Sequence, residues 1–239
     1  PRTTDFLDLS PADLQRDVDA IICNPPYTSG DSLPAAYKDR INAQIEQSIG
    51  NEISARSPLH AYFIYHARQF LSPGDRAAFI TPQSFLSAVY GDKLKQFLLD
   101  RFSLKALVQF NPEGQSVFSD ADTTALIMFL EATSANDSGG ETRFIRVDES
   151  VSVVELRNAV ENTDQESINW GYINCVQQTQ VDPSENWEAL FSPPTIETSD
   201  LSRLGDFATV HRGQTTGNVN FFCLSQADVD DFLRVAIRG

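Results

Sequence analysis

Short apolar runs alternate with amphipathic segments over the first 131 residues, and this alternation narrows the possible folds more than any other feature. Residues 57–74 and 92–102 repeat apolar side chains at helical spacing. The strand-like runs are VDAIIC at 18–23, RAAFITP at 76–82, LKALVQF at 104–110 and TTALIMFLE at 123–131. Strands that alternate with helices predict an α/β sheet of parallel strands with helices on its faces. Because no helix separates the last two runs, we expect them to form an antiparallel edge.

The helix expected within residues 57–74 carries recognisable boundary residues. Ser57 can cap its amino terminus, and Pro58 suits the first turn. Gly74 can close its carboxyl terminus. The strand at 76–82 then follows after a short turn.

Charge is distributed unevenly along the chain, whose net charge is −15. Residues 119–200 carry 3 Lys and Arg against 16 Asp and Glu, whereas residues 1–118 carry 11 against 13. Because phosphate contacts need cationic side chains, the acidic middle segment is not expected to bind nucleic acid. Few lysines and many aspartates resemble proteins from a high-salt cytoplasm, so we expect a halophile-like acidic surface.

Cysteines and histidines are few and scattered. Cys23, Cys175 and Cys223 lie far apart without CxxC spacing, so neither a disulfide framework nor a zinc site is predicted. His60 and His66 lie six apart in one predicted helix, which favours core or surface roles over metal ligation. No apolar run approaches the length of a membrane span, and no signal-type segment is present. We therefore expect a cytoplasmic protein without a membrane or metal partner.

The run at 18–23 leads directly into Asn24, Pro25, Pro26 and Tyr27, at the position where open α/β sheets bind ligands. Each proline fixes its own φ and restricts the residue before it, so this NPPY segment is expected to be stiff and extended. The Asn24 side-chain oxygen and the Pro25 carbonyl can form a two-acceptor clamp for a planar amino group. Tyr27 offers that group's ring a stacking face. A simple strand-terminating turn is the alternative.

NPPY after an apolar strand resembles the catalytic motif of S-adenosylmethionine-dependent amino-methyltransferases, above all the N6-adenine DNA methyltransferases. The resemblance implies that Asn24, Pro25, Pro26 and Tyr27 are catalytic. They would hold the N6 amino group of an adenine flipped out of double-stranded DNA. It also implies a Rossmann-like methyltransferase fold, here partial, followed by the start of a mainly β target-recognition domain.

Two more segments resemble parts of this family. TTDFLDL at 3–9 resembles the segment that meets the cofactor adenine, which implies Asp5 as acceptor of its exocyclic amine and Phe6 as ring contact. GQSVFSDADTTALIMFLE at 114–131 resembles the segment whose aromatic packs against the flipped base, which implies Phe118 as a target-base contact beside Tyr27. An ordinary strand-end aspartate and a core phenylalanine are the alternatives for Asp5 and Phe118.

The tail segment HRGQTTGNVNFF, at 211–222, resembles the opening of the target-recognition region in single-chain adenine methyltransferases and type IIG restriction–modification enzymes. We therefore expect three parts. Residues 1–132 would be the carboxyl-terminal half of a methyltransferase catalytic domain, and residues 133–200 an acidic connecting segment. Residues 201–239 would begin the target-recognition domain.

The family's glycine-rich cofactor loop should precede Asp5, and it has no counterpart in this chain. The acid that grips the cofactor ribose is missing with it. We therefore expect an internal fragment that lacks three of the usual seven strands. In isolation it would bind S-adenosylmethionine weakly or not at all.

The sequence thus predicts a fragment of an adenine-specific DNA methyltransferase from a restriction–modification system. One alternative is an NPPY methyltransferase that modifies a protein glutamine or an RNA base, but such enzymes are compact and need no module after residue 200. Another is a catalytically inert DNA-recognition or subunit fragment. The missing cofactor loop favours the inert fragment, and the intact NPPY disfavours it. Cytosine-N4 enzymes more often carry Ser at the position of Asn24.

Overall fold

The computed structural model of the chain describes residues 4–50, 53–110, 125–134, 139–162, 167–193 and 207–209. The chain divides into two compact units, Pro1–Pro194 and Thr195–Gly239. All helices and strands of the described residues lie in the first unit. Phe118, Cys223 and the expected recognition segment at 211–222 lie outside the described residues.

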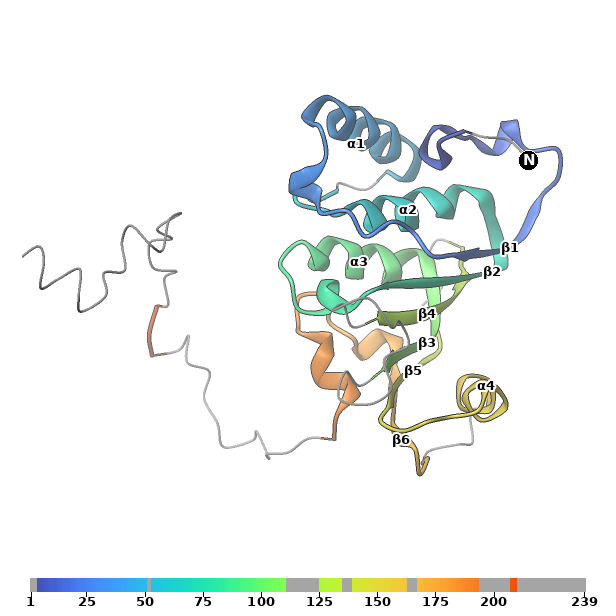
Figure 1. Cartoon of the computed structure of the whole chain (residues 1–239), viewed down its shortest axis with the longest axis vertical. Coiled ribbons are helices and arrows are strands. Elements are labelled where there is room, and N and C mark those ends of the chain that lie inside the picture. Colours follow the sequence, from blue (N-terminus) through green and yellow to red (C-terminus); the bar gives the residue numbers. More distant parts are fainter. Residues whose placement is uncertain are drawn as a thin grey trace, which may run out of the picture. The chain divides into compact units, whose positions relative to one another are not determined.

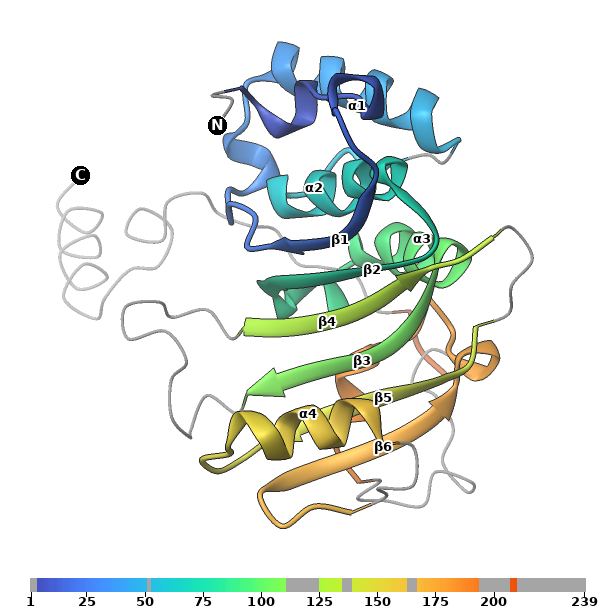
Figure 2. The same cartoon turned by 90° about the vertical axis from the view of Figure 1, so that its right-hand side faces the viewer.

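The strands of the described residues form one mixed sheet, in the order β1-β2-β4-β3-β5-β6 (Figure 2). β1 is parallel to β2 and β3 is parallel to β5, whereas the other neighbouring pairs are antiparallel. Their bounds are Val18–Cys23 (β1), Leu71–Pro82 (β2), Phe102–Phe110 (β3), Ala125–Ala132 (β4), Glu141–Val147 (β5) and Gly171–Gln177 (β6). The α/β class is confirmed. β3 and β4 are antiparallel neighbours as expected, but the expectation that they form an edge is wrong, because they lie in the middle of the sheet between β2 and β5.

Helices cover both faces of the sheet. α2 and α3 lie on one face and α4 on the other, while α1 packs beside α2 (Figure 1). The α-helices are Ala35–Ile49 (α1), Leu59–Ala67 (α2), Gly91–Arg101 (α3) and Val153–Glu161 (α4). Short 3-10 helices lie at Phe6–Asp8, Pro11–Asp13, Gly30–Ser32, Arg68–Phe70, Gln83–Leu86, Gln178–Gln180 and Trp187–Phe191.

The boundaries of α2 differ from those expected. Pro58 occupies the N-cap position and there is no side-chain cap, so the Ser57 hydroxyl is buried without a hydrogen-bond partner among the residues that the structure describes. Gly74 does not close the helix. It lies within β2 at a φ of 94°, because the chain already enters the sheet at Leu71, which pairs with Val18 of β1.

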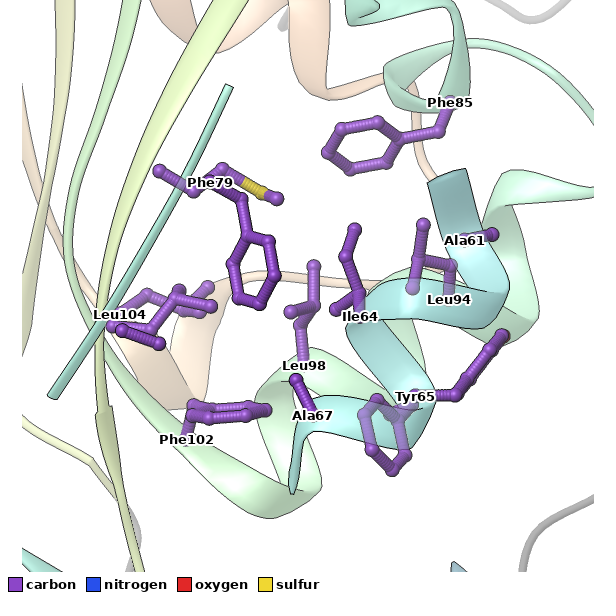
Figure 3. Close-up of a cluster of buried hydrophobic side chains, with 14 of the residues drawn as sticks. Ala61, Ile64, Tyr65, Ala67, Phe79, Phe85, Leu94, Leu98, Phe102 and Leu104 are labelled. Atoms are coloured by element: carbon purple, nitrogen blue, oxygen red, sulfur yellow. The ribbon is translucent and has the colours of Figure 1, made fainter. Parts of the chain in front are cut away.

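The larger core fills the space between the sheet and α1–α3. In Figure 3, Phe79 of β2 and Leu104 of β3 point toward Ile64 of α2 and Leu98 of α3, and all four side chains are fully buried. Burial of each such side chain stabilises the fold by about 1.5–3 kcal/mol. This core fixes α2 and α3 on the sheet.

β1 is an edge strand of the sheet in the described residues, and only one of its faces is packed. Ile21 and Cys23 pack against the larger core, whereas Ile22 is 89% exposed. The apolar run VDAIIC suggests a short buried strand, and the exposure of Ile22 shows that this expectation is wrong for one face. Successive side chains of a strand point to opposite faces of the sheet, and no described residue packs over the face of β1 that carries Ile22.

The expected acidic connecting segment contributes the strands β5 and β6 to the same sheet and the helix α4 to one of its faces. The buried Gln178 side chain accepts a hydrogen bond from the Leu104 amide at 2.9 Å and donates to the Phe102 carbonyl at 2.8 Å. The buried Lys95 ammonium of α3 donates to the Glu185 carbonyl at 2.7 Å. This segment is thus tied to α3 and β3.

Candidate active site

The NPPY segment leaves the sheet at the carboxyl end of β1, directly beside the next strand. Cys23, the last residue of β1, pairs in parallel register with Phe79 of β2. The Tyr27 hydroxyl then donates a hydrogen bond to the Ile80 carbonyl at 3.2 Å. The motif therefore lies against the carboxyl end of β2, the edge at which open α/β sheets bind ligands.

The four side chains of the motif differ in exposure. Asn24 and Pro26 are exposed, Pro25 is buried and Tyr27 is 38% exposed. Neither the Asn24 side chain nor the Pro25 carbonyl has a hydrogen-bond partner among the described residues. Partial burial raises the pKa of Tyr27, so its hydroxyl stays protonated and can donate. The two expected acceptors are thus free.

The loop after Tyr27 is held by α1 and α2. The Leu59 amide donates to the Thr28 carbonyl at 2.9 Å, and the Lys38 ammonium donates to the Gly30 carbonyl at 3.2 Å. Gly30 packs so closely that a Cβ there would lie 2.5 Å from the Ser57 carbonyl oxygen. The start of α2 is therefore fixed next to the motif.

A cavity of about 770 Å³, here named the Tyr27 cavity, opens between this loop, the start of α2 and the turn after β2. Its lining includes Tyr27, Asp31, Arg56, His60, Ser84 and Glu188. Pockets of about 300–1,000 Å³ hold small ligands in proteins. The cavity therefore has room for a nucleotide beside the Tyr27 ring.

His60 is one of the lining residues to which the sequence assigned no site role. Its ring lies 6.3 Å from the Tyr27 ring, centroid to centroid, at an interplanar angle of 82°. Only 2% of the residue is exposed, so of the two positions left open by the sequence, core and surface, His60 occupies the core. Its proximity to Tyr27 depends on the Leu59–Thr28 hydrogen bond, which no local sequence pattern reveals.

Asp5 and Phe6 lie on the amino-terminal segment, which packs on the same two helices. The Asp5 carboxylate accepts hydrogen bonds from the Leu7 amide and the Tyr37 hydroxyl, both at 3.0 Å, and it is exposed. Burial, followed by the hydrogen bond to Asp5, raises the pKa of Tyr37 to about 12. Because Tyr37 holds Asp5 and the adjacent Lys38 holds the Gly30 carbonyl, α1 connects the two expected half-sites.

Phe6 is half-buried in an aromatic cluster. Its ring centroid lies 5.3 Å from that of Phe63, 5.0 Å from that of His66 and 5.6 Å from that of Phe70. Packing of this kind fixes the orientation of the ring. Phe6 therefore has a structural role whether or not it also contacts a ligand.

The described residues contain no group of three or more His, Cys, Asp or Glu side chains placed to hold a metal ion. Within the same parts of the chain, no helix is long and apolar enough to cross a membrane.

Residues 3–118 match the family model described as Eco57I restriction-modification methylase. The type II methyltransferase M.AccI of Acinetobacter calcoaceticus is 25% identical over 223 residues, which cover 92% of this chain and 39% of the relative. M.XamI of Xanthomonas campestris pv. amaranthicola is 26% identical over 200 residues, covering 84% of this chain and 34% of the relative. The chain thus spans less than half the length of these relatives.

Solved structures share the fold. The type IIG restriction endonuclease BpuSI superposes with a TM-score of 0.54 at 18% identity, over 73% of this chain and 21% of that protein. The methyltransferase subunit of a type I restriction-modification system from Streptococcus thermophilus gives a TM-score of 0.52 at 15% identity, over 73% of this chain and 38% of the subunit. The sheet and its helices therefore have the Rossmann-like methyltransferase fold. Residues 3–118 thus resemble the Eco57I restriction-modification methylases in sequence, and the fold agrees with that resemblance.

Proposed function

We propose that the whole protein transfers a methyl group from S-adenosylmethionine to the N6 amino group of adenine in double-stranded DNA. It would act in the cytoplasm as the modification enzyme of a restriction–modification system. One observation carries the proposal. The NPPY segment lies at the carboxyl end of β1 with both amine acceptors free and with Tyr27 tethered to β2. The similarity to M.AccI, a type II methyltransferase, and to BpuSI, a type IIG restriction endonuclease, supports DNA as the substrate.

The residues of the motif suit an aromatic amine. Its nitrogen lone pair is conjugated with the ring and is therefore a poor nucleophile. Hydrogen bonds from the two N–H groups to the Asn24 amide oxygen and the Pro25 carbonyl would favour a pyramidal nitrogen with a localised lone pair. Fixed acceptors of this kind stabilise the positive charge that develops on nitrogen during transfer. The Tyr27 ring would stack on the base, and Phe118 remains a proposed second contact.

The residues present fit one end of the methyl donor. An exposed carboxylate that accepts two hydrogen bonds still has lone pairs for a third, so Asp5 can accept from the adenine amine of S-adenosylmethionine. The half-buried Phe6 beside it would contribute a ring contact. When bound, the cofactor supplies an electrophilic methyl group on a sulfonium centre. Within the described residues we assign no group to its ribose.

The remaining parts of the chain receive roles by the same proposal. Residues 1–132 would belong to the catalytic domain, and residues 133–200 would connect it to a target-recognition domain beginning at 201–239. The packing of Gln178 and Lys95 supports a connection that is firmly attached on the catalytic side.

Analysis of the methylated product tests the proposal. The whole protein is incubated with methyl-labelled S-adenosylmethionine and genomic DNA, and the DNA is digested to nucleosides for mass spectrometry. We expect label in N6-methyldeoxyadenosine. Label in N4-methyldeoxycytidine, or incorporation only into RNA or protein offered in parallel reactions, would contradict the proposal.

A further inference from the structure

His60 is buried beside the motif with its hydrogen-bonding capacity unused. Only 2% of the residue is exposed, and neither Nδ1 nor Nε2 has a hydrogen-bond partner within the described parts of the chain. A buried polar group without a partner costs about 1–3 kcal/mol, and native structures contain few of them. An apolar ring would fill the same space without this cost. The Tyr62 and Tyr65 hydroxyls of the same helix are also buried and, among the described residues, unpaired, so what distinguishes His60 is its position in the lining of the Tyr27 cavity, beside the Tyr27 ring.

The other buried histidine of α2 shows the contrast. His66 is fully buried, and its ring nitrogens lie 2.8 and 3.1 Å from the Gln69 amide nitrogen. That imidazole has a partner within the protein. His60 has none, although the two residues share a helix of nine residues.

Most polar groups around the Tyr27 cavity are already paired. The Tyr27 hydroxyl donates to the Ile80 carbonyl, and the Ser84 and Tyr90 hydroxyls lie 2.9 Å apart. The Ser87 hydroxyl donates to the Glu188 carboxylate at 3.1 Å. His60 is thus a buried lining side chain with both a free donor and a free acceptor, next to the ring on which a base would stack.

We propose that His60 is a specificity-determining residue that hydrogen-bonds a ring nitrogen of the base held in the Tyr27 cavity. The inference rests on the proposed function and deepens it, because an adenine ring offers nitrogen acceptors along its edges. The interaction would pair the free N–H of the imidazole with such an acceptor. Binding of the base would then relieve the unpaired state of the buried imidazole.

The neutral imidazole has the right chemistry for this contact. Burial lowers the pKa of His60 to about 4, so the ring is uncharged near pH 7. A neutral imidazole has one N–H donor and one nitrogen acceptor. It can therefore recognise a ring nitrogen without placing a cation in the cavity.

Three variants of the whole protein test the inference: His60→Phe, His60→Gln and, as the matched control, His66→Phe. Each is assayed for kcat/KM on its own methylation site and for Tm. We expect His60→Phe to keep or raise the Tm and to lower kcat/KM about tenfold, as for the loss of one hydrogen bond. His60→Gln should recover part of that loss. His66→Phe should lower the Tm, because it removes an imidazole that has a partner within the protein.

Substrate analogues then identify the partner atom. DNA carrying 1-deaza-, 3-deaza- or 7-deazaadenine at the target position removes one ring nitrogen at a time. The wild-type enzyme should lose about tenfold on one analogue, and His60→Phe should lose nothing further on it, because the two changes remove the same hydrogen bond.

Two sets of results overturn the inference in distinguishable ways. In the first set, wild type methylates DNA and only the inference fails. This holds if His60→Phe has the same kcat/KM as wild type, or if its Tm falls by several degrees. It also holds if each analogue lowers kcat/KM of His60→Phe as much as it lowers that of wild type. If wild type methylates no adenine, the proposed function fails and this inference fails with it.

Discussion

The Tyr27 hydroxyl donates a hydrogen bond to the Ile80 carbonyl at 3.2 Å, across 53 residues of sequence. This bond ties the loop after β1 to the carboxyl end of β2 and holds the tyrosine ring at the Tyr27 cavity. It separates two properties of the residue, since the hydroxyl anchors the loop and the ring is left to contact a ligand.

Substitution of Tyr27 tests this division. Tyr27→Phe removes one hydrogen bond and should cost about 1 kcal/mol of stability with a small loss of activity. Tyr27→Ala also removes the ring, and stacking on a base is worth about 1–3 kcal/mol, so kcat/KM should fall a further ten- to hundredfold. The measurements are urea denaturation and methylation kinetics of the whole protein. Equal activity of the two variants would exclude a stacking role.

Gly30 tests whether the start of α2 must lie close to the motif. In Gly30→Ala the new Cβ would lie 2.5 Å from the Ser57 carbonyl oxygen, so the backbone must shift. We expect a loss of about 1–3 kcal/mol in the free energy of unfolding, together with reduced methylation. Gly140→Ala is the control, because a Cβ there meets nothing within 4 Å. A Gly30→Ala variant as stable and active as this control would refute the tight packing.

Arg56 is an exposed cation in the lining of the Tyr27 cavity, where it could contact a DNA phosphate. Arg56→Ala should raise the Kd for DNA about threefold to tenfold and reduce the slope of log K against log salt by about 0.9. Titration of labelled DNA at several salt concentrations measures both. Arg157→Ala, on α4 at the other face of the sheet, should change neither (Figure 1). Identical slopes for wild type, Arg56→Ala and Arg157→Ala would argue against a contact between Arg56 and a DNA phosphate.

Gln178 tests how firmly the acidic segment belongs to the first unit. Gln178→Ala would leave the Leu104 amide and the Phe102 carbonyl without this partner, at a cost of about 2–4 kcal/mol. The neighbouring Gln177 is exposed, and Gln177→Ala should be nearly neutral. Chemical denaturation compares the two. Equal midpoints would show that residues 171–191 contribute little to the stability of the sheet.

Some strands and helices could be predicted, because they depend on local periodicity, but α1, α4 and β6 were not expected. The run at 18–23 is β1 as its pattern indicates, and residues 92–102 overlap α3. Sheet order could not be predicted in the same way. The position of β4 between β2 and β3 depends on pairings such as that of Phe79 with Met128, which are distant in sequence. The exposure of Ile22 also could not be predicted from the apolar run, because it depends on how the sheet is packed.

The candidate site, too, could be predicted only where it depends on local sequence and not on tertiary contacts. Asn24 to Tyr27 could be placed at a strand end because the proline pair follows an apolar run. The role of Asp5 as cap of a 3-10 helix and partner of Tyr37 requires packing between the amino-terminal segment and α1. The place of His60 beside Tyr27 could not be predicted, because it depends on the tertiary contact between α2 and the loop after Tyr27.

The central claim is that the Asn24 amide oxygen holds the amino group of the substrate, and single-turnover methylation by Asn24→Ala tests it most directly. Asn24 is exposed and without a partner among the described residues, so its loss should leave the Tm unchanged. Asn158→Ala, exposed on α4, serves as the control. We predict a rate of methyl transfer to DNA at least about a hundredfold below wild type for Asn24→Ala alone. A rate within about threefold of wild type, at saturating DNA and S-adenosylmethionine, would contradict the account.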